Sequence, residues 1–195
     1  RGLWKPESVD GLRLHVILDG GDRAWVGLSP MDRSSPHLGG IHRLRSHRDA
    51  PSRSALKLEE GLQTLLSPVD QHLAFNGRVT AVDLGAAPGG WTWVLRRRGV
   101  HVIAVDKGPL APDLDADPEV EHVPGDGFTF QPPEPVDWLV CDMVDKPARV
   151  VETMARWLRR GWARRALFNL KLPMRRRWQA VADAHDRFHR VLGDR

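Results

Sequence analysis

Five predicted strands of this sequence alternate with predicted helices, and this order limits the fold more than any other feature. The strands are expected at Arg78–Leu84, Val100–Val105, Glu119–Pro124, Val136–Cys141 and Ala166–Leu170. The helices among them are expected at Trp91–Arg98, Ala148–Arg160 and Arg175–Leu192. Because alternating strands and helices build a parallel sheet covered on both faces, we predict an α/β fold with a doubly wound, Rossmann-like sheet.

Charged residues stand at or just beyond the ends of these strands. They are Asp83, Asp106, Asp126, Asp142 and Lys171. Parallel strands bring their carboxyl ends to one edge of the sheet, which is where ligands bind in open α/β folds. Burying charges there is costly unless they have partners, so we predict a ligand site at this edge.

The chain before the sheet has a different pattern. Leu12–Leu18 alternates apolar and polar residues, a turn follows, and Ala24–Leu28 is apolar again, which predicts a β-hairpin. A basic linker without a steady period then leads to Ser54, which we predict to cap a helix reaching about Leu66. We therefore expect one domain over residues 1–51 and a second over residues 52–195.

Composition excludes several classes of protein. No apolar run approaches the roughly 20 residues of a membrane-spanning helix, and the first residues show no secretory signal. The single cysteine, Cys141, excludes an internal disulfide and a cysteine-based zinc site. This pattern leads us to expect a cytoplasmic protein without a membrane partner.

The charges are segregated along the chain. Of 29 basic residues 24 are arginine, and the segment Arg156–Arg177 has nine basic residues and no acid. The segment Val100–Asp145 instead has eleven acids and one lysine. One basic face and a high isoelectric point indicate an anionic partner, most often nucleic acid. Solvated arginine-rich helices would give the same composition, so the charges alone leave both readings open.

A glycine-rich loop follows the first strand of the sheet and opens a helix. It runs from Asp83 through Gly85, Ala87, Pro88, Gly89 and Gly90 to Trp91, and Asp106 follows 21 residues after Gly85. Small residues let the backbone approach a ligand, and a carboxylate at the end of the next strand accepts bonds from an adenosine ribose. The pattern predicts a cofactor that contains adenosine.

Three details of the loop favour S-adenosylmethionine. Pro88 interrupts the dinucleotide fingerprint, which requires free amide groups at the helix N-terminus for a pyrophosphate. Asp83 is placed to hold the cationic end of the cofactor, and Asp126 with Phe128 to hold its adenine. The alternative is a glycine-rich turn beside incidental acids.

Two lysines are candidates for the chemistry. Lysine is rare in this chain, and unlike arginine it can lose its proton when its surroundings favour the neutral amine. Lys171 at the end of a strand is therefore a candidate general base, and Lys57 on the helix before the sheet is a second candidate. A solvated surface position is the ordinary alternative for either lysine.

Four segments together resemble the FtsJ-like, Rossmann-fold ribose 2′-O-methyltransferases. They are Ser52–Glu60, the Asp83–Trp91 loop, Cys141–Ala148 and Phe168–Met174. The resemblance covers nearly the whole chain and is strongest to members that methylate a cytidine ribose in 23S ribosomal RNA. It implies S-adenosylmethionine as cofactor and ribosomal RNA as partner, with Arg156–Arg177 and Arg43–Arg53 on the RNA backbone.

The resemblance also implies roles for individual residues. Lys57, Asp142 and Lys171 match three members of a Lys-Asp-Lys-Glu tetrad that binds the target ribose, with Lys171 as proton acceptor. Cofactor contacts are implied at Ser54, from Ala87 through Gly90, and at Asp106, Asp126 and Asp142. No metal is required, and we interpret His185 and His189 as surface residues.

The sequence departs from the family pattern in several places. The glutamate of the tetrad and two closing strands have no match, and the family's RNA-binding THUMP domain would be represented only by the hairpin. Because Arg1 is not an initiator methionine, we expect a fragment of a longer protein, and we expect it to be a monomer. Two other functions stay open: an idle RNA-binding protein on a methyltransferase fold, and a methyltransferase for small molecules or proteins.

Overall fold

The computed structural model describes residues 10–35, 37 and 40–193. Residues 1–9, in which the sequence predicts no secretory signal, lie outside the described part. The chain divides into two compact units, Arg1–Leu44 and Arg45–Arg195. In the described residues, no helix is both long enough and apolar enough to span a membrane.

The first unit contains the predicted hairpin. Strands β1 (Leu12–Leu18) and β2 (Ala24–Pro30) pair antiparallel, and a short 3-10 turn, η1 (Met31–Arg33), follows. The hairpin is closed where the amide of Asp19 donates to the carbonyl of Arg23 at 2.9 Å. Many of its apolar side chains are exposed, among them Leu12, Leu14, Ile17, Trp25 and Leu28.

The second unit is built on a five-stranded parallel sheet. Its strands are β3 (Thr80–Leu84), β4 (His101–Asp106), β5 (Val120–Pro124), β6 (Val136–Cys141) and β7 (Ala163–Phe168). Their spatial order is β5-β4-β3-β6-β7. The strands β4 and β5 lie on one side of β3, and β6 and β7 lie on the other, so the strand order reverses between the neighbours β3 and β6. This order confirms the doubly wound, Rossmann-like fold, and the reversal is where such sheets open a ligand crevice.

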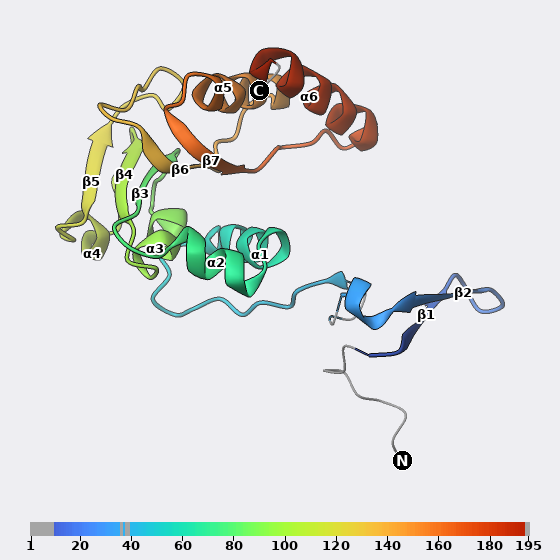
Figure 1. Cartoon of the computed structure of the whole chain (residues 1–195). Coiled ribbons are helices and arrows are strands. Elements are labelled where there is room, and N and C mark those ends of the chain that lie inside the picture. Colours follow the sequence, from blue (N-terminus) through green and yellow to red (C-terminus); the bar gives the residue numbers. More distant parts are fainter. Residues whose placement is uncertain (1–9, 36, 38–39, 194–195) are drawn as a thin grey trace. The chain divides into compact units, whose positions relative to one another are not determined.

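Helices cover both faces of this sheet (Figure 1). One face carries α1 (Ala55–Leu65), α2 (Pro68–Ala74) and α3 (Gly90–Arg96), and the other carries α5 (Pro147–Arg159) and α6 (Arg177–Leu192). A one-turn helix, α4 (Pro112–Asp115), precedes β5. Successive strand residues point to opposite faces, so Ala81 packs toward α1 and α3 while Val82 packs toward α5.

Three local predictions need correction. Ser54 precedes α1 but its side chain caps no amide, because its hydroxyl is bonded to Ser52 instead. The helix α2 was not predicted, although Ser67 caps it by accepting from the amide of Asp70 at 3.1 Å. The last strand ends at Phe168, so Lys171 lies three residues past the strand, on an exposed segment.

Candidate active site

The glycine loop lies where β3 passes into α3, and its shape depends on glycine at three positions. Gly85 and Gly89 have φ angles of +78° and +111°, which other residues rarely adopt. A Cβ at Gly85 would lie 2.5 Å from Cγ of Met143, and one at Gly90 would overlap the hydroxyls of Ser52 and Ser54. Glycine at these positions therefore lets the loop pack closely against Met143 and the two serines.

Asp106 holds this loop in place from the end of the neighbouring strand. Its Oδ2 accepts from the amide of Ala87 at 3.1 Å, and its Oδ1 accepts from the amide of Gly108 at 2.8 Å. The peptide bond between Ala87 and Pro88 is cis. A carboxylate fixed in this way keeps free lone pairs for hydroxyl groups of a ligand.

A pocket of about 280 Å³ opens beside Asp106. Asp126 lies in its wall and accepts from the amide of Phe128 at 2.9 Å. The guanidinium of Arg149 lies 3.7 Å from the centre of the Phe128 ring, which holds that ring at the pocket. Other lining residues are Gly85, Val105, Lys107, Gly125, Gly127 and Met143.

Asp83 is the most deeply buried charged group of the site. Its side chain is 1% exposed, and burial raises its pKa to about 7, with further repulsion from Asp142 and Asp106. Thr92 opposes this by donating to Oδ2 at 2.8 Å, while Oδ1 has no hydrogen-bond partner in the described part of the chain. A buried carboxylate oxygen without a partner is suited to receive a cationic group.

Asp142 lies directly after β6 and organises the second half of the site. Nζ of Lys57 donates to both of its oxygens, at 2.7 and 3.0 Å. Nδ2 of Asn169 donates to Oδ1 at 3.0 Å. These bonds join α1, β6 and the segment after β7, three parts of the chain that the sheet topology brings to one edge.

Lys171 lies beside this cluster but is not bonded to it. It lines a groove of about 480 Å³ together with Lys57 and Asn169, and it also borders a pocket against α6. Among the described residues it makes no hydrogen bond or ion pair. Its side-chain nitrogen is thus free to meet a ligand that enters the groove.

The structure brings most of the predicted residues to one edge of the sheet, in two groups. The loop residues Gly85 to Gly90 lie with Ser54, Asp83, Asp106 and Asp126. Lys57 and Lys171 border the groove, and Asp142 is bonded to Lys57. Sequence reasoning missed Asn169, Met143 and Arg149. Asn169 and Met143 had a signal, since they lie in the segments Phe168–Met174 and Cys141–Ala148, whereas Arg149 had none.

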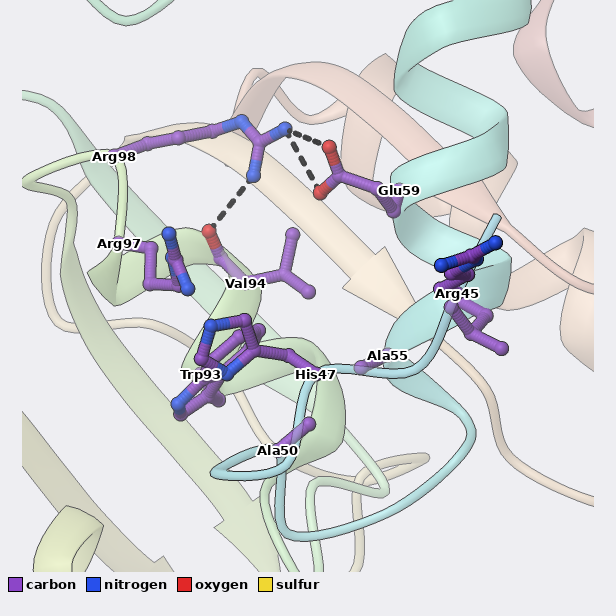
Figure 2. Close-up of a pocket in the computed structure, with 10 residues that line it drawn as sticks. Arg45, His47, Ala50, Ala55, Glu59, Trp93, Val94, Arg97 and Arg98 are labelled. Carbon is purple, nitrogen blue, oxygen red and sulfur yellow. Dashed lines mark hydrogen bonds and ion pairs between the residues drawn. The ribbon is translucent and has the colours of Figure 1, made fainter. Parts of the chain in front are cut away.

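Another pocket, of about 450 Å³, lies on the outer faces of α1 and α3 (Figure 2). The His47 ring packs against Trp93 in a tilted arrangement with ring centres 5.2 Å apart, and the guanidinium of Arg97 lies 4.9 Å from the same tryptophan ring. Arg98 is paired with Glu59 at 2.8 Å, whereas Arg45 and Arg97 have no ion pair among the described residues. The contact between His47 and Trp93 holds the basic linker against α3, and Arg45 and Arg97 give the pocket unpaired positive charge.

A glycine loop, a ribose-type carboxylate and a Lys–Asp pair at one edge of a doubly wound sheet define a Rossmann-fold methyltransferase. The match of the chain to the FtsJ-like methyltransferase family over residues 50–161 agrees with this class. The chain belongs to that family.

Proteins of known name are similar to this chain over about 90% of its length. The Ribosomal RNA large subunit methyltransferase M of Alkalilimnicola ehrlichii is 57% identical over 177 residues, covering 91% of this chain and 49% of that protein. Its namesake from Xanthomonas campestris pv. campestris is 50% identical over 176 residues, covering 90% of this chain and 51% of that protein. The chain thus spans about half the length of these relatives. A TehB-like SAM-dependent methyltransferase structure from Corynebacterium glutamicum is 21% identical, with a TM-score of 0.41 over 70% of this chain and 79% of that one.

S-adenosylmethionine is the cofactor of this family, and the residues present fit it. The unpartnered, buried Oδ1 of Asp83 suits a cationic amino-acid end. Asp106 and Asp126 border the adjacent pocket, where they can accept from ribose hydroxyls and an adenine amino group. No group of three or more metal-ligating side chains occurs among the described residues.

Proposed function

We propose that this chain is the catalytic part of an enzyme that methylates large-subunit ribosomal RNA, at the 2′-oxygen of a cytidine. The observation that carries the proposal is the Lys57–Asp142–Asn169 cluster, which stands beside the cofactor loop and opens into the groove of Lys171. The names of the relatives support ribosomal RNA as the substrate. The 2′-oxygen and the cytidine base rest on the family resemblance.

In the proposed reaction, each residue has a separate task. S-adenosylmethionine supplies a methyl group that its sulfonium makes electrophilic. Lys171, as its neutral amine, would accept the proton of the 2′-hydroxyl, so that the oxygen can take the methyl group that the sulfonium gives up. Asp142, held by Lys57 and Asn169, orients the ribose, because an in-line displacement depends mainly on alignment.

The RNA backbone would lie on basic residues outside the cofactor site. In the segment Arg156–Arg177 only Arg164 has an ion pair, with Asp137 at 3.1 Å, among the residues that the structure describes. Arg45 and Arg97 add unpaired charge on the linker side. Contacts between these charges and phosphates release counterions from the RNA. Because added salt opposes that release, RNA binding should weaken steeply as the salt concentration rises.

Methyl transfer from tritiated S-adenosylmethionine to unmodified 23S ribosomal RNA tests the proposal. Lys171→Met should abolish transfer and leave cofactor affinity, measured by calorimetry, within about threefold of the parent. Lys171→Arg should fail equally, because arginine keeps the charge but cannot take the proton. Turnover by Lys171→Arg near that of the parent would show that Lys171 is not the base.

A second candidate function is an idle RNA-binding protein on the same fold. The observation in its favour is that Lys171 is exposed and makes no bond to Asp142 or Lys57. This candidate predicts RNA binding without methyl transfer to any large-subunit RNA, even when the cofactor is bound. Transfer that depends on Lys171 excludes it.

A further inference from the structure

A tryptophan and three arginines stand together at the start of α6 with nothing packed on them. Trp178 is 82% exposed, although tryptophan is a large apolar side chain that folded proteins usually cover in part. Arg175, Arg176 and Arg177 precede it directly and are all exposed. We name residues Lys171–Trp178 the arginine–tryptophan segment.

The three arginine side chains of this segment are unpaired. None of its three arginine side chains makes an ion pair or hydrogen bond in the described part of the chain, and the segment has no acidic residue. Met174 adds a second apolar side chain, 85% exposed. Unpaired guanidinium groups next to exposed apolar area fit a partner that is both anionic and aromatic.

The backbone of the segment is also unusual. Arg176 has φ +56° and ψ +39°, and it is the one residue other than glycine with a positive φ angle in the described ranges. A left-handed conformation is unfavourable for a residue with a side chain. Strained backbone of this kind clusters at functional sites.

The other tryptophans show that Trp178 is exceptional within the second unit. Trp91 and Trp157 are buried in the core, and Trp138 is buried beneath α2. Trp93 packs against the tilted ring of His47, and Trp162 packs edge-on against Trp157 at 5.6 Å. Trp178 makes no aromatic or cation–π contact among the described residues, so both faces of its ring are available.

We infer that the arginine–tryptophan segment binds single-stranded RNA beside the reacting ribose, with an unpaired base stacked on Trp178 and phosphates on Arg175–Arg177. Aromatic side chains that stack on bases, next to cations that hold the backbone, are the means by which proteins bind single strands. The segment begins at Lys171, so Trp178 lies at most about 25 Å from the proposed base. The inference rests on the proposed function for the position of the target and deepens it.

Fluorescence anisotropy with this chain and a labelled RNA oligonucleotide tests the inference, using the single strand and its duplex. Trp178→Ala should weaken single-strand binding by about 5- to 150-fold, the loss expected for one stacked base. Trp178→Phe should recover most of the affinity, and duplex binding should change little because paired bases cannot stack on the ring. Leu73→Ala, which truncates an exposed apolar side chain on α2, is the matched control and should leave single-strand binding unchanged.

The outcomes separate this inference from the proposed function. Single-strand affinity of Trp178→Ala within twofold of the parent overturns it, as does equal weakening for single strand and duplex. If Trp178→Ala loses affinity as expected while the parent transfers no methyl group, the RNA surface stands and the proposed enzyme does not. If the segment fails to bind RNA and instead binds another protein chain, the arginine–tryptophan segment is a protein-binding surface and the inference is overturned.

Discussion

Replacing Asp83 with asparagine will change the way in which the stability of the fold depends on pH. The carboxyl of Asp83 is buried, and its pKa is raised from 3.8 to about 7 in the folded chain. The folded state therefore keeps this proton over a pH range in which the unfolded chain loses it. The resulting stabilisation is complete below about pH 4 and is lost as the pH rises through about 7.

The size of the effect follows from the two pKa values. Between pH 5 and pH 8.5, linkage gives a loss of about 3 kcal/mol in the free energy of unfolding from this one group. Asparagine does not titrate, and its amide oxygen can still accept the bond from Thr92. The stability of Asp83→Asn relative to the parent should therefore rise by about 3 kcal/mol over this pH range.

Urea unfolding of both proteins at pH 5 and pH 8.5 measures this difference, because all other titrating groups cancel. Thr92→Val provides a second test. The hydroxyl of Thr92 favours the ionised form of Asp83, so its removal should raise the pKa of Asp83 further. The free energy of unfolding should then fall more steeply with rising pH than in the parent. If the parent and Asp83→Asn change in parallel between the two pH values, the reasoning about burial is refuted.

Three further predictions concern the site and the core. The Cβ of Gly89→Ala would overlap Cδ1 of Leu114, whereas that of Gly77→Ala, at a similar φ of +85°, would meet open space. Gly89→Ala should therefore lower the free energy of unfolding by about 1–3 kcal/mol more than Gly77→Ala does. Comparable melting temperatures of the two variants would contradict this. Asp106→Ala should abolish cofactor binding in calorimetry, because the loop amide of Ala87 loses its acceptor; affinity close to that of the parent would remove Asp106 from the cofactor site. The thiol of Cys141, whose pKa burial raises to about 12, should not react with a disulfide reagent at pH 8 until the chain is unfolded; rapid native labelling would show that β6 is open to solvent.

Cofactor binding adds a linked test of Asp83. If its ionised carboxylate receives the cationic end of S-adenosylmethionine, affinity should fall by up to about tenfold for each pH unit below 7. Asp83→Asn should bind weakly at every pH and show no such slope. A slope that persists in Asp83→Asn would assign the titration to another group.

The sequence by itself determined the class of fold and the edge that carries the site. The spacing of apolar residues along the chain indicates the order of strands and helices, and glycines mark the loop that needs positive φ angles. The positions of Asp106 and Asp142 at strand ends placed them at one edge, since all parallel strands end there. These features depend on neighbouring residues only, so they can be read without the fold.

Short elements escaped this reasoning. The seven-residue α2 and the one-turn α4 contain too few residues for a period to be visible. The end of β7 was placed two residues late because Asn169 and Leu170 continue its pattern, although the strand ends at Phe168. Where a strand stops depends on its neighbour in the sheet, and β7 pairs with β6 only as far as Phe168 opposite Cys141.

Only the tertiary structure decided which side chains meet. Lys57 and Asp142 are 85 residues apart in the chain, and the topology of α1 and β6 brings them within 2.7 Å. Asp83 acquires its raised pKa from the layers that exclude water around it, and Trp178 is left exposed because α6 presents other residues to α5. Desolvation and long-range contact depend on the whole packing of the chain, which no local pattern records.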